Sequence, residues 1–239
     1  SDTIIPRTPA SASPDDRAMI ARFSPFCYGP REVRMTETIS VSLIGRVEAT
    51  LILQDFQSSR STPVPKLEVL IRHGARGDRH AGGRLIDARE KLLLAHGFRK
   101  GAEIANHREV SIVSTEDLAH IQAQLGLPTP IPPGCLGENL VVSGIPDLSE
   151  LPTGTLLFFQ DGETIRNAVL TVWDENHHCL APGAVLQEQY PEHPGLVAKF
   201  VRASRSHRGL VASVYSNGVI KPGDMAIAYP PQPRKALPP

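Results

Sequence analysis

The chain has 239 residues, and its 25 Lys and Arg equal its 25 Asp and Glu, so the formal net charge is zero. This length can bury a sizeable core, whereas the charge balance gives no overall field that would attract nucleic acid or an anionic membrane. Three cysteines are too few for a disulfide framework, and no apolar run reaches the roughly 18 residues of a membrane helix. Because the N-terminal residues also lack the order of a secretory signal, we expect a cytoplasmic protein without a nucleic-acid or membrane partner.

Both ends of the chain are rich in proline. Residues 1–40 and 230–239 are predicted to be tails, since their composition cannot bury enough apolar area to offset the entropy of ordering. Cys27 lies in an aromatic segment of the first tail and is expected to pack rather than react. The folded domain is predicted over residues 41–229.

The domain reads as a series of short strands with few helices between them. Alternating apolar residues predict strands over residues 38–53, 64–71, 109–113, 137–142, 155–159, 167–173, 209–215 and from 219 onward. Helices are predicted over 85–98, from a capping box at 114–117 to Gly126, and within 190–202. Because these helices do not alternate strictly with strands, we predict a mainly β fold, a closed or nearly closed mixed β-barrel.

Residues 72–84 form a basic, glycine-rich loop with four arginines, two histidines and four glycines. The guanidinium groups of Arg76, Arg79 and Arg84 suit phosphate or carboxylate. A polar turn in which Asp78 caps backbone N–H groups and pairs with Arg79 is the plainer interpretation. The density of positive charge favours an anion site.

The strand predicted over residues 167–173 ends in a polar segment that leads to Cys179. His177 and His178 precede this cysteine, and two imidazoles beside a thiol can increase its thiolate fraction. Pro182-Gly183 is expected to force a turn after it. Cys179 is therefore a candidate for chemistry, with an ordinary half-buried cysteine as the equal alternative.

Two further interpretations concern neighbouring polar residues. Glu138 and Asn139 begin a strand, where such side chains either knit loops together or point into a pocket, and Cys135 is expected to pack behind them. His177, His178, Cys179 and His80 have the side chains of a zinc site. No Cys-x-x-Cys or His-x-x-x-His spacing supports zinc, so it remains a minor alternative.

Several pieces of the chain, taken in order, resemble the MOSC domain, which is found at the C-terminus of molybdenum cofactor sulfurases and also alone. The resemblance covers about residues 45–229 and implies a barrel of the pyruvate-kinase-barrel type with Cys179 as the motif cysteine. The matching pieces are Gly77-Asp-Arg-His-Ala-Gly82, Asn106-His-Arg-Glu-Val-Ser-Ile112, Gly137-Glu-Asn-Leu-Val-Val142, Gly144, Gly154-Thr155, Glu175-Asn-His-His-Cys-Leu-Ala-Pro-Gly183, Arg208-Gly209 and Gly218-Val-Ile-Lys-Pro-Gly-Asp224.

This resemblance implies that Cys179 is either a molybdenum ligand or a persulfide sulfur carrier, and a thiolate suits both roles. The reaction would be reduction of N-hydroxylated compounds or sulfur transfer to the molybdenum cofactor (molybdopterin), as an oxidoreductase or a sulfur transferase. Many family members have proline where this chain has His178, which could tune the thiolate. The residues expected to bind the cofactor are Arg76, Asp78, Arg79, His80, Arg108, Glu138, Asn139, His178 and Arg208.

Within this set, four cationic side chains would hold the anionic end of the cofactor: Arg76, Arg79, His80 and Arg108. Glu138 and Asn139 would hydrogen-bond the pterin, and Asp78 would orient Arg79. Pyridoxal phosphate would enter only through a partner cysteine desulfurase, and reduction would need an electron-donor protein. A non-catalytic ligand-binding or metal-binding barrel module is the alternative function.

Overall fold

The computed structural model describes residues 42–87, 90–162, 168–177 and 179–231. The tail predicted over residues 1–40, most of the one predicted over 230–239, Cys27 and His178 lie outside these residues. The chain divides into two units, Ser1–Thr38 and Ile39–Pro239, and the fold described below belongs to the second.

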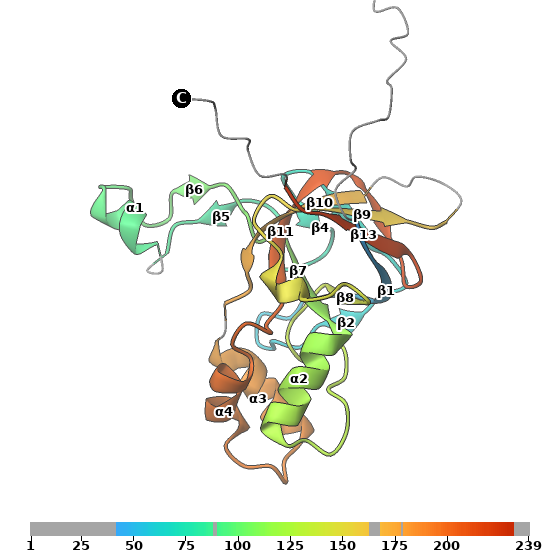
Figure 1. The fold of residues 1–239 in the computed structure, drawn as a ribbon. Coiled ribbons are helices and arrows are strands. Elements are labelled where there is room, and N and C mark those ends of the chain that lie inside the picture. Colours follow the sequence, from blue (N-terminus) through green and yellow to red (C-terminus); the bar gives the residue numbers. More distant parts are fainter. Residues whose placement is uncertain (1–41, 88–89, 163–167, 178, 232–239) are drawn as a thin grey trace, which may run out of the picture. The chain divides into compact units, whose positions relative to one another are not determined.

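Seven strands form the centre of the fold (Figure 1): β1 (Leu43–Ile52), β7 (Val110–Ser114), β8 (Leu140–Ser143), β9 (Leu156–Gln160), β10 (Ala168–Glu175), β11 (Leu210–Ser216) and β13 (Met225–Tyr229). Their order is β13-β9-β10-β11-β7-β8-β1, and β1 pairs again with β13, which closes the barrel. The pair β7–β8 is parallel, whereas the other neighbours in the barrel are antiparallel. The predicted closed, mixed β-barrel is confirmed.

Shorter elements surround the barrel: β2 (Thr62–Pro63), β3 (Leu67–Leu70), β4 (Gly74–Ala75), β5 (Arg84–Leu85), β6 (Glu103–Ile104), β12 (Gly218–Ile220), α1 (Lys91–Ala95), α2 (Thr115–Leu125), a 3₁₀-helix η2 (Leu148–Glu150), α3 (Leu180–Gln189) and α4 (Leu196–Ala203). Strand β2 extends the large sheet beside β1, β12-β3-β4 form a small sheet, and β5 pairs with β6. Helices α2, α3 and α4 gather at one end of the barrel, while the arm β5–α1–β6 leaves its side (Figure 1).

Two apolar cores explain why the strands carry so few polar residues. One fills the barrel with side chains such as Leu140, Leu170 and Phe159. The other lies between the helices and the outer face of β1, β7 and β8, around Ile121 and Phe200. Strands β7 and β8 contribute to both cores, and strands buried on two faces have nearly continuous apolar sequences.

The start of α2 follows the predicted capping box. The Ser114 hydroxyl accepts a hydrogen bond from the Asp117 backbone N–H at 2.9 Å and donates one to the Asp117 carboxylate at 2.8 Å. Gly126 ends the helix with a φ of 67°, the left-handed conformation that glycine adopts without strain. The predicted helix boundaries are confirmed because local capping sets both of them.

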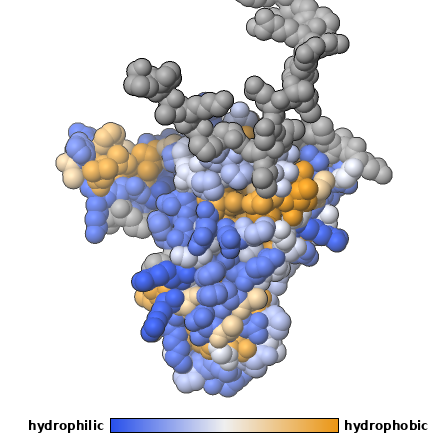
Figure 2. All heavy atoms as spheres, viewed as in Figure 1, coloured by the Kyte–Doolittle hydropathy of each residue, from blue (hydrophilic) through white to orange (hydrophobic). Residues whose placement is uncertain are grey.

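The helix predicted over residues 85–98 is largely wrong. Among the described residues of this range, only Lys91–Ala95 is helical, and none of these five is buried. Leu85 instead pairs with Glu103 as part of the arm. Short helices without tertiary packing are marginal in water, so apolar periodicity alone overestimated this one. Much of the periodic apolar sequence stays on the surface, where the arm exposes Leu85, Leu92 and Phe98 and carries hydrophobic patches in Figure 2.

The turn predicted at Pro182-Gly183 is also wrong, because both residues lie in the first turns of α3. The first N–H groups of a helix have no partner within it, so a proline there costs no hydrogen bond. Gly183 serves the contact with α4: a Cβ atom at this position would lie 2.8 Å from Val197 Cα and 3.1 Å from Phe200 Cβ.

The longest helix in the described ranges, α2, has 11 residues. None of the helices there has the length and apolar character needed to cross a membrane.

We expect Gly183→Ala to destabilise the protein by about 1–3 kcal/mol, because a methyl group must force α3 and α4 apart. At an open helical position the same change would stabilise by roughly 0.5–1 kcal/mol. The urea midpoints of wild type and Gly183→Ala measure this change in stability. Ala184→Ser, at an exposed position of the same helix, is the control, and a stabilised Gly183→Ala variant would contradict the close contact.

Candidate functional site

A cavity of about 670 Å³ lies between the end of β10, the start of α3 and the basic loop. Four arginines and two carboxylates line it together with Cys179: Arg79, Arg84, Arg108, Arg208, Glu90 and Asp174. The candidate thiol and part of the basic loop therefore face one space, and the charge around that space is positive on balance. We call it the first cavity.

Cys179 lies where a strand gives way to a helix. Strand β10 ends at Glu175, and Cys179 is the N-cap residue of α3 with an extended backbone (φ −143°, ψ 172°). The backbone N–H of Asn176 donates to the Gly209 carbonyl at 2.8 Å, which fixes the chain after the strand. The Cys179 side chain is exposed, so a ligand or partner can reach the sulfur.

Arg208 is a buried cation at the wall of the first cavity. One guanidinium nitrogen, Nη2, donates to the Leu136 carbonyl. The other two, Nε and Nη1, are buried without a hydrogen-bond partner in the described part of the chain. Burial lowers the pKa of Arg208, while the nearby Glu138 and Cys179 act in the opposite direction. A buried donor without an acceptor is costly, so this side chain favours an anionic ligand.

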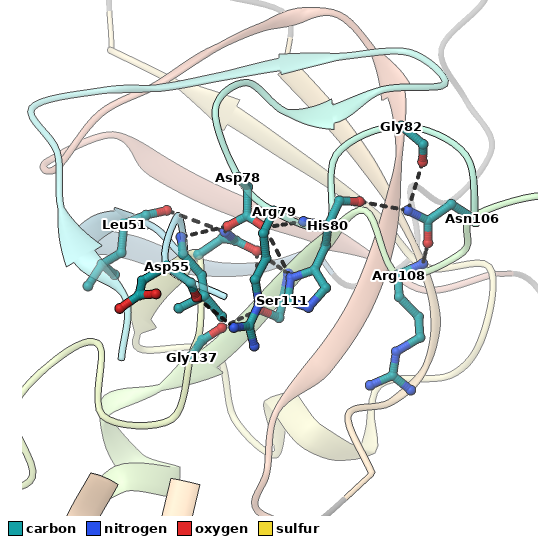
Figure 3. A network of polar contacts seen from close by, with 12 residues as sticks. Leu51, Asp55, Asp78, Arg79, His80, Gly82, Asn106, Arg108, Ser111 and Gly137 are labelled. Carbon is teal, nitrogen blue, oxygen red and sulfur yellow. Dashed lines mark hydrogen bonds and ion pairs between the residues drawn. The ribbon is translucent and has the colours of Figure 1, made fainter. Parts of the chain in front are cut away.

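Arg108 is held by two asparagines. Its Nη2 donates to Asn176 Oδ1 at 2.9 Å, and its backbone N–H donates to Asn106 Oδ1 at 3.0 Å. Asn106 also donates to the carbonyls of His80 and Gly82, at 2.9 and 3.1 Å. Figure 3 shows this asparagine between the basic loop and Arg108, whose guanidinium extends away from it. Asn106 therefore sets the position of both cationic segments.

Asp78 is the hub that fixes the basic loop (Figure 3). Its Oδ2 accepts from the Leu53 N–H at 2.8 Å and from Asn139 Nδ2 at 2.7 Å. Its Oδ1 accepts from the His80 N–H at 2.8 Å and contacts His80 Nδ1 at 3.0 Å. Burial alone would raise the pKa of Asp78, but the hydrogen bonds from His80, Leu53 and Asn139 outweigh it and lower that pKa below its usual value.

Arg79 does not pair with Asp78, so the prediction that Asp78 orients this arginine through a direct contact is wrong. The Arg79 Nη1 donates instead to the carbonyls of Asp55 and Ser58, both at 2.7 Å. The carboxylate is already saturated by four other contacts, and a neighbouring loop holds the guanidinium at the cavity wall.

Glu138 holds a loop together and does not line the first cavity. It is fully buried, and its carboxylate accepts from the Gly134 N–H at 2.6 Å and the Leu136 N–H at 3.0 Å. Burial raises the pKa of Glu138, although these hydrogen bonds and Arg208 act against that effect. The structure therefore places both Glu138 oxygens beneath the surface, engaged by backbone N–H groups and away from the first cavity.

Three other predicted residues have different outcomes. Asn139 lines the first cavity, but its Oδ1 accepts from the Ser111 N–H at 3.0 Å. Arg76 pairs with Glu68 at 3.0 Å, is 60% exposed and does not line the cavity. The structure therefore does not bring Arg76 together with the other predicted cationic residues at the first cavity. Cys135 is buried in the helical core, as predicted, and burial raises the pKa of its thiol to about 11.

The zinc alternative depended on histidines that do not converge. His177 is exposed and lies 3.4 Å from Asp174, whereas the His80 ring contacts Asp78. Among the residues with described coordinates, no group of three or more His, Cys, Asp or Glu side chains is arranged to hold a metal ion. His178 lies outside that set.

Sequence reasoning missed two rings at the cavity wall. His107 and Trp173 stack with their centroids 3.9 Å apart and their planes 5° apart. Trp173 Nε1 also donates to Ser213 Oγ at 2.7 Å. The register of β10 against β11 shifts between Val172 and Asp174, so Trp173 is the extra residue of a β-bulge. Bulges re-aim side chains next to functional sites, and regular alternation cannot reveal them.

A sequence model of the MOSC domain matches residues 80–226. The chain is 40% identical over 152 residues to the YuaD protein of Bacillus subtilis (strain 168), covering 63% of this chain and 73% of that protein. The name of that protein assigns it provisionally to metal-sulfur cluster biosynthesis. The crystal structure of YuaD from Bacillus subtilis superposes with a TM-score of 0.71 at 34% identity, covering 80% of this chain and 99% of that one.

We expect Asp78→Asn to lower the free energy of unfolding by about 2–4 kcal/mol, because an amide offers one acceptor where four contacts exist. Since the pKa of Asp78 is lowered by folding, its stabilisation is present above the ordinary value of 3.8 and is lost as the pH falls through the lower folded value. The difference in the free energy of unfolding between wild type and Asp78→Asn, measured by urea unfolding, should therefore become smaller below about pH 3.8.

Asp55→Asn is the matched control, because this exposed carboxylate accepts only from the Gln57 N–H among the described residues. It should change stability by less than about 0.5 kcal/mol. Equal effects of the two substitutions would contradict the role of Asp78 as a hub.

Proposed function

The chain belongs to the MOSC domain family, and on this premise we propose that it binds a molybdenum cofactor in the first cavity, with Cys179 as molybdenum ligand or sulfur carrier. The single observation that carries the proposal is the buried Arg208, whose Nε and Nη1 have no partner in the described part of the chain. It lines the same cavity as the exposed thiol.

The residues present suit such a cofactor. Molybdopterin carries a phosphate, and guanidinium groups bind phosphate through paired, charge-assisted hydrogen bonds. Arg208 and Arg108 would hold this anionic end, since both line the cavity and Arg108 is kept in place by Asn176. The thiolate of Cys179 is a soft ligand suited to a thiophilic metal. Bound there, the metal would supply two-electron redox chemistry.

The chain's own residues would hold the cofactor in position and cover part of the cavity wall. Asp78 and Asn106 fix the basic loop, so Arg79 and His80 meet the ligand without first being ordered. The stacked pair of His107 and Trp173 covers part of the cavity wall with flat apolar surface. Such preorganisation lowers the entropic cost of binding. Reduction of an N-hydroxylated compound would then need an external electron donor.

Sulfur transfer is the second candidate, and the exposure of Cys179 favours it. A partner cysteine desulfurase, which would bring its own pyridoxal phosphate, could place sulfur on a thiol that it can touch. The name of the YuaD relative also refers to metal-sulfur chemistry. A barrel that binds a ligand without turnover would share the cavity but would neither hold molybdenum nor accept sulfur on Cys179.

The first prediction of this proposal concerns metal content. Protein purified from a host that makes the cofactor should contain molybdenum and pterin, measured by elemental analysis and by fluorescence of the oxidised pterin. Arg108→Gln should lower both at least about tenfold, because a lost charge-assisted hydrogen bond costs roughly 1.5–3 kcal/mol. Arg76→Gln is the matched control, since Arg76 lies outside the first cavity and pairs with Glu68.

Cys179→Ser extends the same experiment to the metal itself. It should lose molybdenum and can retain pterin through the arginines. Wild type free of both molybdenum and pterin would overturn cofactor binding, and so would equal losses in Arg108→Gln and Arg76→Gln.

The second prediction concerns sulfur. Intact mass after incubation with a cysteine desulfurase and cysteine should rise by about 32 Da, the increment of one persulfide sulfur. Cys179→Ser should abolish this rise. Cys135→Ser should keep it, because Cys135 is buried and the pKa of its thiol is raised to about 11. A rise that persists without Cys179 would rule out the assigned carrier.

A further inference from the structure

A second cavity of about 550 Å³ adjoins the first. His107 and Trp173 line both cavities. These two rings stack face to face at 3.9 Å, and because both belong to the walls of both cavities we call the pair the partition. A hydrogen bond from Trp173 to Ser213 at 2.7 Å anchors this partition to β11.

The second cavity has the opposite charge preference. One arginine, Arg72, faces two acidic side chains, Glu103 and Glu109. Apolar side chains such as Ile71, Ile104 and Val214 make up much of the remaining wall. The first cavity has four arginines against two carboxylates. An anion suits the first space, and an uncharged or cationic molecule suits the second.

Glu109 is a buried charged side chain in the wall of the second cavity. It is 4% exposed, and its Oε2 accepts from the Val214 N–H at 2.7 Å. No donor from the described residues contacts Oε1, which leaves this oxygen for a ligand. Gly74 lies directly against the Glu109 side chain, since a Cβ atom at Gly74 would lie 2.8 Å from Glu109 Cβ. Burial raises the pKa of Glu109, while the Val214 hydrogen bond and His73 oppose that shift. A nearby cation or N–H donor would therefore stabilise the carboxylate.

We propose that the second cavity binds the organic substrate, a flat uncharged or cationic molecule whose N–H groups meet Glu109 and whose ring lies against Trp173. Flat apolar rings stack favourably on an indole, and cations gain further attraction from its face. Because the partition lines both cavities, the substrate would lie next to the first cavity, where the cofactor is proposed to bind. The role of this ligand as the substrate rests on the proposed function, whereas its binding in the second cavity does not.

The experiment uses metal-free protein and two probes of equal size and shape. Benzamidine is a flat cation with N–H donors, and benzoate is a flat anion. The chain contains one tryptophan, so its intrinsic fluorescence reports on the partition when excited at the red edge of absorption, and calorimetry gives the affinities. Benzamidine should bind, and inorganic phosphate in excess should not displace it.

Three substitutions distinguish binding in the second cavity from binding in the first. Glu109→Gln keeps an acceptor for the Val214 N–H and should weaken benzamidine about tenfold, the cost of one charge-assisted hydrogen bond, while phosphate affinity stays unchanged. Arg108→Gln should weaken phosphate and leave benzamidine unchanged. Glu103→Gln provides a second acidic variant on the arm and should also weaken benzamidine.

The inference fails if benzoate binds as tightly as benzamidine, if both glutamate variants bind benzamidine like the wild type, or if phosphate competes with it. Unchanged thermal unfolding of the variants ensures that a loss of binding is a local effect. A protein that binds benzamidine in this pattern but never acquires molybdenum would refute the proposed function and leave the second binding site standing.

Discussion

The end of the β10–β11 ladder is the constraint on which the candidate site depends. The Asn176 N–H donates to the Gly209 carbonyl at 2.8 Å. Cys179 lies three residues after Asn176, and Arg208 lies one residue before Gly209. One backbone hydrogen bond therefore brings the thiol and the buried cation to the same edge of the barrel. Gly209 has a φ of +80°, and a Cβ there would collide with the Ile112 carbonyl, so the close approach of β11 to β7 requires glycine.

The buried charge of Arg208 links stability to ligand binding. Burial lowers the pKa of this arginine and Glu138 opposes that shift, but the Glu138 carboxylate accepts its hydrogen bonds from the Gly134 and Leu136 N–H groups. The charge of Arg208 is therefore incompletely compensated, and such a buried ion costs several kcal/mol. An anion in the first cavity would supply the missing acceptors. This cost is the physical reason why the proposed function places an anionic group beside Arg208, since a fully paired arginine would gain little from a ligand.

Much of this architecture follows from sequence patterns, and the exceptions have physical causes. Period-two alternation revealed strands that pack one face into the barrel, whereas β7 and β8, which contribute to both cores, show as short apolar runs. Capping residues set the ends of α2 because that chemistry is local. The direction of a polar side chain at a loop depends on contacts distant in sequence. Arg76 turns outward to Glu68, and Glu138 turns inward, where it accepts from the Gly134 and Leu136 N–H groups. Pro182 reads as a breaker, yet it fits the first turn of a helix, where no intrahelical partner is lost.

The bulge at Trp173 explains how two cavities of opposite charge can share one strand. In a regular strand, consecutive side chains point to opposite faces, so Trp173 and Asp174 could not line the same space. The register shift inserts Trp173 as an extra residue between the pairs Val172–Ala212 and Asp174–Val211, and both side chains then face the first cavity. The shift also turns the indole across the sheet edge, where His107 stacks on it and Ser213 holds its N–H. Without the extra residue, strict alternation would direct Trp173 and Asp174 to opposite faces, and the two side chains could not line the first cavity together.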